Sequence, residues 1–91
     1  MQPHILLVDD EAAITDNLTP FLERSGFKVS VASNGEEALE IIAIEEINLI
    51  VSDVLMPKLD GRELLRSLRQ ADNWIPVILL TQVGEAFERA M

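Results

Sequence analysis

Four apolar segments alternate along the chain with longer segments whose apolar residues recur at helical spacing. Apolar runs that are short and bounded by charged or turn-forming residues are typical of strands buried in a parallel sheet. The segment 27–32 differs from the others because its apolar and polar residues alternate, which predicts an edge strand or a half-buried strand. The predicted strands are residues 5–8, 27–32, 48–53 and 77–80.

The first helical segment lies in residues 11–25. Its apolar side chains fall on one helical face, and Gly26 follows where a C-terminal cap is expected. Pro20 lies inside this segment and removes a backbone donor, so we expect a kink or an early end to the helix. The apolar face consists of Ile14, Leu18, Phe21 and Leu22.

Two further helices are marked by capping signals. Ser33 to Glu36 has the S-x-x-E form of a capping box, and apolar residues follow it at helical spacing. Asp60 can cap the next helix with Glu63 three residues later, and the leucines after it would face the core. We also expect residues 84–91 to begin one more helix. The core-facing leucines are Leu64, Leu65 and Leu68.

The order of the predicted elements, a strand followed by a helix and repeated along the chain, indicates a parallel sheet wound by right-handed crossovers. The fold class is therefore α/β. A chain of 91 residues is long enough for one small domain, and no linker interrupts it. We expect a single domain over residues 1–91 that stops within or near its fourth helix.

Charge and composition exclude several classes of function. The net charge of −9 gives an acidic surface that repels phosphate backbones, so this segment is not expected to bind nucleic acid directly. The chain has no cysteine, which excludes disulfides and thiolate metal sites. Its apolar runs are too short to cross a membrane, and a cytoplasmic location fits. His4 is expected to be a surface residue, and Trp74 a loop residue that covers one end of the core.

Polar residues terminate three of the four predicted strands. Asp9 and Asp10 follow the first strand, Asp53 ends the third, and Thr81 follows the fourth. Ligands of an open parallel sheet bind at the carboxyl ends of its strands, so we expect these side chains to share one rim. Three carboxylates there would repel one another and favour a hard divalent cation such as Mg²⁺. A carboxylate beside that cation can attack phosphorus and form an aspartyl-phosphate.

Three strings of the sequence resemble the bacterial receiver domain, the phosphoacceptor domain of two-component signalling. They are residues 6–11 (LLVDDE), residues 53–61 (DVLMPKLDG) and residues 77–81 (VILLT). The second string, of the form D-x-x-M-P-x-x-D-G, is the most specific of the three. The resemblance runs from residue 4 to the last residue of the chain.

The resemblance implies a flavodoxin-like, doubly wound parallel sheet with the strand order 2-1-3-4. It implies that Asp53 is the phosphoacceptor, and that Mg²⁺ is bound by Asp9, Asp10 and Asp53 together with the backbone carbonyl of Leu55. It implies that the Thr81 hydroxyl is the switch group. It further implies a sensor histidine kinase as the phosphoryl donor, and a regulatory switch of a phosphorelay rather than an enzyme.

The C-terminal part of the family pattern is missing from this sequence. Receivers have a fifth strand, with a lysine that contacts the phosphoryl group, and a fifth helix, and neither follows here. We therefore expect the fourth strand to have an open edge and one face of the sheet to be under-covered. Self-association or an exchange of elements through that edge is the expected consequence.

Two other functions are open at this point. One is a pseudo-receiver, which is never phosphorylated and serves as an interaction or dimerisation module. The other is a Mg²⁺-dependent phosphatase of the haloacid dehalogenase type, which also uses an aspartate nucleophile at the end of a parallel strand. That class needs D-x-D after its first strand, whereas this chain has Asp9 and Asp10 side by side. Steady turnover of a phosphate ester would favour the phosphatase.

Overall fold

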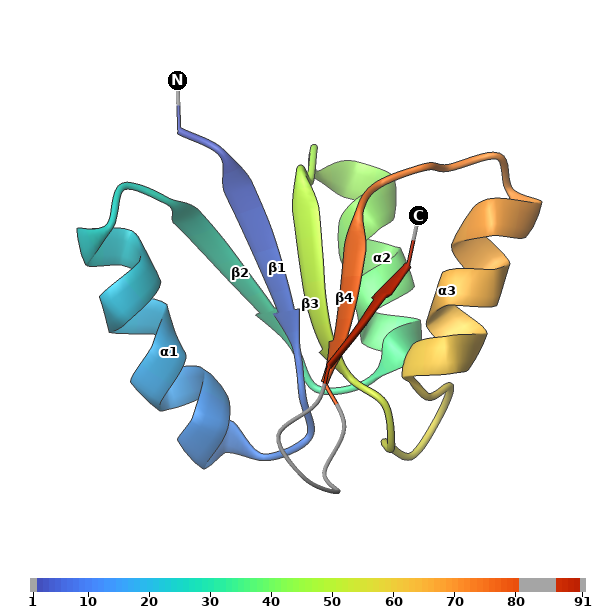
Figure 1. Ribbon diagram of the computed structural model, residues 1–91, viewed down its shortest axis with the longest axis horizontal. Coiled ribbons are helices and arrows are strands. Elements are labelled where there is room, and N and C mark those ends of the chain that lie inside the picture. Colours follow the sequence, from blue (N-terminus) through green and yellow to red (C-terminus); the bar gives the residue numbers. More distant parts are fainter. Residues whose placement is uncertain (1, 81–86, 91) are drawn as a thin grey trace.

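In the part of the chain that the structure describes, three helices pack against a five-stranded sheet (Figure 1). The computed structural model describes residues 2–80 and, as backbone, residues 87–90. The elements are β1 (His4–Val8), α1 (Ala12–Arg24), β2 (Lys28–Ala32), α2 (Gly35–Ile44), β3 (Leu49–Asp53), α3 (Gly61–Gln70), β4 (Val77–Leu80) and β5 (Phe87–Ala90). The bounds of the first four strands agree with the predicted bounds to within one residue.

The sheet has the strand order β2-β1-β3-β4-β5, and its first four strands run parallel. The predicted order 2-1-3-4 is thus confirmed. The chain winds outward from β1 to β2 and then returns to β3, so the direction of winding reverses between β1 and β3. The helix α1 covers one face of the sheet, and α2 and α3 cover the other (Figure 1).

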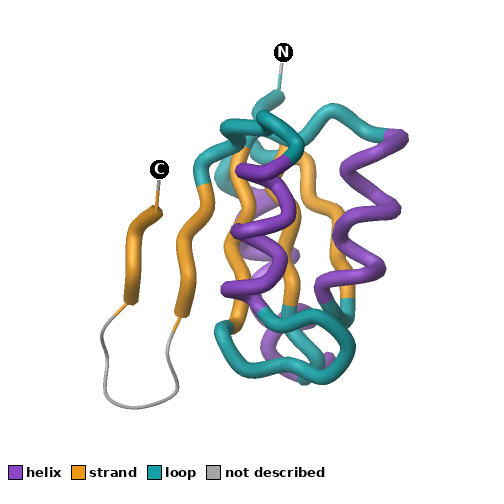
Figure 2. Tube along the Cα trace, turned by 90° about the vertical axis from the view of Figure 1, so that its right-hand side faces the viewer, coloured by secondary structure: helices purple, strands orange, loops and turns teal. Residues whose placement is uncertain are grey.

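The expected helix over residues 84–91 is wrong, because residues 87–90 form the strand β5. This strand pairs antiparallel with β4, with Leu80 opposite Phe87 and Val77 opposite Ala90. Figure 2 shows β5 at the outer edge of the sheet. A helix this short is marginal by itself, whereas the edge of β4 offers a row of backbone donors and acceptors. The expectation of an open β4 edge is therefore wrong. Self-association or an exchange of elements stays a prediction.

The core lies between the sheet and the pair of helices α2 and α3. Side chains from the three central strands form its floor, and Leu64 and Leu68 of α3 close it with exposed fractions of 0% and 2%. Both leucines were predicted to face the core, and Leu65 packs against the same cluster. Fully buried members from the strands are Leu6, Val8, Ala32, Ile50, Val77 and Leu79.

The face of the sheet beneath α1 is covered less completely. Val51, Ile78 and Leu80 are only half-buried there. On α1 itself, Ile14 is 38% exposed and Phe21 is 57% exposed, although both belong to the predicted apolar face. One helix alone does not span this side of the sheet, as expected from the sequence.

Capping contacts place the first turns of α2 and α3. Asp60 and Glu63 form the predicted capping box, in which each side chain accepts a hydrogen bond from the other residue's backbone N–H at 2.9 Å. The box predicted from Ser33 is displaced by one residue. Asn34 is the actual N-cap of α2 and accepts from the Glu37 N–H at 2.9 Å. The Glu37 carboxylate in turn accepts from the backbone N–H of Ser33 at 3.1 Å.

Two local expectations about the N-terminal half are corrected. Of the two outcomes expected at Pro20, a kink or an early end, the early end is wrong, because α1 continues to Arg24. Gly26, with φ of 99°, follows the cap of α1 as predicted. His4 is buried, with an exposed fraction of 6%, and not a surface residue. Its Nε2 lies 2.7 Å from the Ser30 hydroxyl, and its Nδ1 lies 3.1 Å from the Glu46 carbonyl oxygen. These partners explain how a polar ring is accommodated in the sheet.

Trp74 lies in the connection between α3 and β4, as expected, but it is 62% exposed. The Arg69 guanidinium lies over its ring, with the guanidinium carbon 5.3 Å from the ring centroid, and its Nε1 donates to the Asp72 carboxylate at 2.8 Å. None of the helices within the described residues is long and apolar enough to cross a membrane.

The substitution Asp60→Ala should lower the free energy of unfolding by about 1 kcal/mol, because it removes the N-cap of α3. Chemical denaturation followed by circular dichroism measures this difference. Glu40→Ala is the matched control, since it removes one carboxylate from an exposed position in the middle of α2. Equal stability of the two variants would contradict the role assigned to the cap.

Candidate functional site

Three carboxylates lie together at the carboxyl ends of β1 and β3. Asp53 is the last residue of β3, and Asp9 and Asp10 follow β1 directly. The parallel register places Val8 opposite Ser52, so the next residue on each strand, Asp9 and Asp53, reaches the same rim. Carboxylate oxygens of all three aspartates lie within 4.8 Å of one another.

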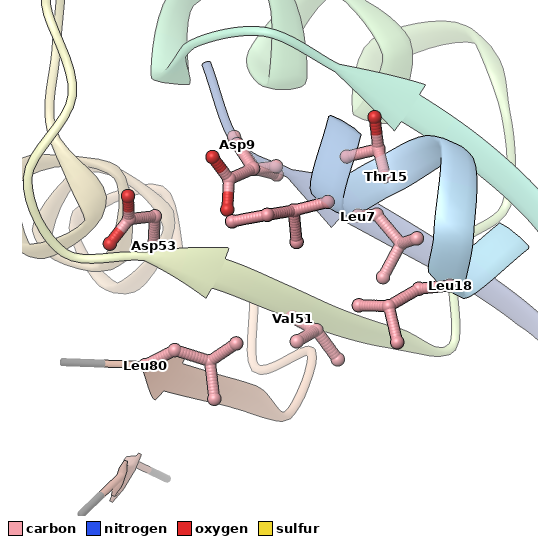
Figure 3. Close-up of a pocket in the computed structure, with 9 residues that line it drawn as sticks. Leu7, Asp9, Thr15, Leu18, Val51, Asp53 and Leu80 are labelled. Atoms are coloured by element: carbon pink, nitrogen blue, oxygen red, sulfur yellow. The ribbon is translucent and has the colours of Figure 1, made fainter. Parts of the chain in front are cut away.

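Burial distinguishes the three side chains. Asp9 and Asp53 are buried, with exposed fractions of 8% and 5%, whereas Asp10 is exposed. The carboxylates of Asp9 and Asp53 lie at the end of an apolar hollow between α1 and the sheet (Figure 3). The hollow is lined below them by Leu7, Ile14, Thr15, Leu18, Val51 and Leu80. The site thus has a charged rim above an apolar wall.

Backbone contacts hold the two buried aspartates in place. The Asp9 N–H donates to the Ala32 carbonyl of β2 at 3.0 Å, and the Asp9 carboxylate accepts from the Glu11 N–H at 2.9 Å. The carbonyl of Asp53 accepts from the Ser52 hydroxyl at 2.8 Å. Gly61, the first residue of α3, packs against that same carbonyl, and a Cβ atom there would lie 2.3 Å from the oxygen. The main chain of Asp53 is therefore held by two neighbours, whereas Asp9 is held once through its main chain and once through its carboxylate.

The electrostatics of the site disfavour a full set of negative charges. Burial raises the pKa of the Asp9 carboxyl above its ordinary value, and the negative charges of Asp53 and Asp10 raise that pKa further. The hydrogen bond from the Glu11 N–H acts in the opposite direction. A cation placed among the three carboxylates would remove the repulsion between them.

The loop of residues 54–60 joins Asp53 to α3 and carries Leu55, whose side chain is 61% exposed. Its backbone is unusual, because Lys58 and Leu59 both have positive φ, at 53° and 68°. A left-handed conformation costs a residue with a side chain roughly 1–2 kcal/mol. The backbone N–H of Gly35, at the start of α2, donates to the Leu59 carbonyl at 3.0 Å.

The structure brings together three of the five site residues expected from the sequence, Asp9, Asp10 and Asp53. Leu55 lies in the loop that starts at Asp53, and Thr81 lies outside the described residues. The chemical roles of all five remain predictions. The contact between Gly35 and Leu59 was missed, because these residues are distant in sequence and neither carries a reactive side chain. A glycine in the first turn of the predicted helix was the only available signal.

The donor set determines the chemistry that this rim can support. Carboxylate oxygens are hard ligands, and Mg²⁺ typically takes one or two of them, together with waters and phosphate oxygens. Asp53 and Asp9 are buried beside each other, and Asp10 adds a third carboxylate at the solvent side. The residues present therefore fit a small divalent cation of the Mg²⁺ type.

Comparisons with known proteins agree with this arrangement. The model of a family described as the response regulator receiver domain matches residues 5–91. The chain is 46% identical over 91 residues to the alkaline phosphatase synthesis transcriptional regulatory protein PhoP of Bacillus subtilis, a match that covers 100% of the chain and 38% of that protein. It is 39% identical over 89 residues to the response regulator MprA of Mycolicibacterium vanbaalenii, with 98% of the chain and 38% of that protein covered.

Solved structures show the same likeness. The receiver domain of the Francisella response regulator 1452 superposes with a TM-score of 0.87 at 35% identity, over 93% of this chain and 70% of that one. The receiver domain of a signal transduction histidine kinase from Syntrophus aciditrophicus gives a TM-score of 0.83 at 39% identity, over 91% and 64%. The chain thus spans little more than a third of the curated relatives and about two thirds of these structures.

The substitution Asp9→Asn should raise the unfolding temperature of the metal-free protein by a few degrees at neutral pH. The pKa of Asp9 is raised in the folded state, so its charged form destabilises the fold. That penalty is absent below the ordinary pKa of an aspartate and grows as the pH rises through the folded-state pKa. Thermal unfolding in a chelating buffer at several pH values measures the difference.

The exposed neighbour provides the control for this prediction. Asp10→Asn removes the same charge from a position in solvent and should change the unfolding temperature less. An Asp9→Asn variant that unfolds at or below the wild-type temperature at neutral pH would show that the Asp9 carboxylate is not destabilising.

Proposed function

Because this chain belongs to the response regulator receiver domain family, we propose that it is the phosphoryl-accepting switch of a two-component phosphorelay. Asp53 takes the phosphoryl group, and a sensor histidine kinase supplies it. The proposal includes a cytoplasmic location and a regulatory rather than an enzymatic role. Direct binding of nucleic acid is not part of it, given the net charge of −9.

One observation carries the proposal. Three carboxylates from the ends of two adjacent parallel strands lie within 4.8 Å of one another, at the point where the direction of winding reverses. Ligand sites of open α/β sheets occur at such a point. A cluster of like charges is costly in an apoprotein, and a bound divalent cation offsets that cost.

Asp53 is the nucleophile of the phosphoryl transfer. A carboxylate oxygen of Asp53 attacks phosphorus and forms a phosphorus–oxygen bond, while the phosphorus–nitrogen bond of the phosphohistidine breaks. The electron pair of the broken bond returns to the imidazole nitrogen of the donor. The main chain of Asp53 is fixed by Ser52 and Gly61, which keeps the nucleophile in a constant position during the transfer.

The carboxylates of Asp9, Asp10 and Asp53 fit Mg²⁺. They would hold the ion, with the carbonyl of Leu55 as a further protein ligand. When bound, the ion neutralises charge that develops on the phosphoryl oxygens. The Asp9 carboxylate is oriented for this role by the Glu11 N–H. The exposed Asp10 completes the ligand set from the solvent side.

The Thr81 hydroxyl is the proposed group that reports the phosphorylated state. Thr81 follows β4, whose last residue Leu80 pairs with Asp53 across the sheet. A hydroxyl at the end of this strand can donate to a phosphoryl oxygen on Asp53 and so couple the chemistry to the adjoining chain.

The first test is the intact mass of the protein after incubation with Mg²⁺ and acetyl phosphate. We expect one phosphoryl group on the wild type and none on Asp53→Asn, because the amide is not a competent nucleophile. Asp60→Asn is the matched control, since asparagine also caps a helix and Asp60 lies outside the carboxylate cluster. It should be modified as fully as the wild type.

Three other outcomes would overturn parts of the proposal. Modification of Asp53→Asn would place the acceptor elsewhere, and modification without Mg²⁺ would remove the metal from the mechanism. A wild type that stays unmodified by both acetyl phosphate and a phosphorylated histidine kinase would contradict the switch, and the protein would then act as an interaction module.

A further inference from the structure

We propose that Gly35, at the start of α2, is a positioning residue for the divalent-ion site at the carboxylate rim. The inference rests on the proposed function, in which Mg²⁺ binds Asp9, Asp10, Asp53 and the Leu55 carbonyl. Gly35 itself touches none of these groups. It acts through Leu59, by holding the loop that carries Leu55.

The contact between the two segments is direct and close. The Gly35 N–H donates to the Leu59 carbonyl at 3.0 Å, and Gly35 is buried. A Cβ atom on Gly35 would lie 2.3 Å from that carbonyl oxygen and 3.0 Å from the Cβ and Cδ2 atoms of Leu59. The first of these separations is too short for any real contact, and the obstacle is backbone. A side chain at position 35 therefore has to push the loop away.

The loop needs such an anchor because of its own conformation. Lys58 and Leu59 occupy the left-handed region in succession, which residues with side chains adopt rarely and usually singly. If the Leu59 carbonyl lost its hydrogen bond with the Gly35 N–H, Lys58 and Leu59 would be free to return to more favourable backbone angles. The Leu59 side chain packs against the core cluster and assists the anchor without replacing the hydrogen bond.

The rest of the loop transmits this constraint to the site. At the far end, the Gly61 N–H donates to the Val54 carbonyl at 2.9 Å, and Gly61 packs on the carbonyl of Asp53. The segment that contains Leu55 is thus held between Asp53 at its start and the Gly35–Leu59 contact near its end. Movement of Leu59 changes the path of that segment and with it the position of the Leu55 carbonyl.

A role in α2 alone does not explain the glycine. Alanine is a better helix former than glycine, so Gly35 weakens the first turn of α2. Asn34 already caps that turn, because its side chain accepts a hydrogen bond from the Glu37 N–H. The close approach of Leu59 is the feature that requires a residue without a side chain.

The test compares two glycine-to-alanine variants of the full chain. Gly35→Ala displaces the loop, whereas Gly26→Ala strains a residue with φ of 99° that has nothing within 4 Å of the added Cβ atom. Both variants should therefore be less stable than the wild type, which thermal unfolding verifies. Only Gly35→Ala should weaken the divalent-ion site. Binding of Mn²⁺, measured by electron paramagnetic resonance without a phosphodonor and repeated with Mg²⁺ as competitor, is the readout.

We expect Gly35→Ala to bind Mn²⁺ about three- to tenfold more weakly than the wild type, the factor for losing one net hydrogen bond. Gly26→Ala should bind it as the wild type does. Equal affinity of Gly35→Ala and the wild type would overturn the inference and leave the proposed function intact. A wild type that binds neither ion would overturn the inference, and the phosphorylation assay on the same sample then shows whether the proposed function fails with it.

A second measurement covers the case in which Gly35→Ala does not fold. Coupling between two sites is reciprocal, so an ion that benefits from the Gly35–Leu59 hydrogen bond must also strengthen it. Hydrogen exchange of the Gly35 amide in the wild type should slow several-fold on saturation with Mg²⁺. The control is the Phe27 amide, which follows α1 and donates to the Leu22 carbonyl, and its exchange should slow less. An unchanged Gly35 exchange rate would overturn the inference.

Discussion

The parallel pairing of β1 with β3 is the constraint on which the rest of this structure depends. Its register sets Leu6 opposite Ile50 and Val8 opposite Ser52, which builds the buried layer beneath α2 and α3. The same register brings Asp9 and Asp53 to one rim. Because side chains alternate between the two faces of a strand, a slip of one residue would move Leu6 and Val8 to the opposite face of the sheet and separate the carboxylates. Core and site are therefore specified by one interaction.

The two faces of the sheet are completed to different degrees. The face under α2 and α3 is closed, while Ile14 and Phe21 of α1 and half-buried strand residues remain partly open on the other. The matched receiver structures are longer, since the chain covers 70% of the Francisella receiver domain. The apolar hollow below Asp9 and Asp53 lies on this less covered face. The packing beneath α2 and α3 therefore fixes the strands that position the two buried carboxylates. The less covered face beneath α1 provides the apolar hollow that they border.

Local patterns predicted what local interactions decide. The four parallel strands and the cap at Asp60 depend on residues close in sequence, and both were found where expected. The C-terminal segment was misassigned because its structure is determined by the edge of β4, which a periodicity within residues 84–91 does not reveal. His4 was misassigned for a similar reason, since its partners Ser30 and Glu46 come from other elements. The approach of Leu59 to Gly35 likewise arises only when the elements pack.

Trp74 is the one tryptophan of the chain, and it lies before the start of β4, at the end of the sheet opposite to the carboxylates. Its indole is fixed by Arg69 and Asp72, neither of which belongs to the rim. The intrinsic fluorescence of this protein therefore senses the connection between α3 and β4 and is remote from the rim. Bound Mg²⁺ would be too far from the indole to change its emission directly. A change in emission on adding Mg²⁺ would therefore mean that the structure rearranges at the opposite end of the sheet as well.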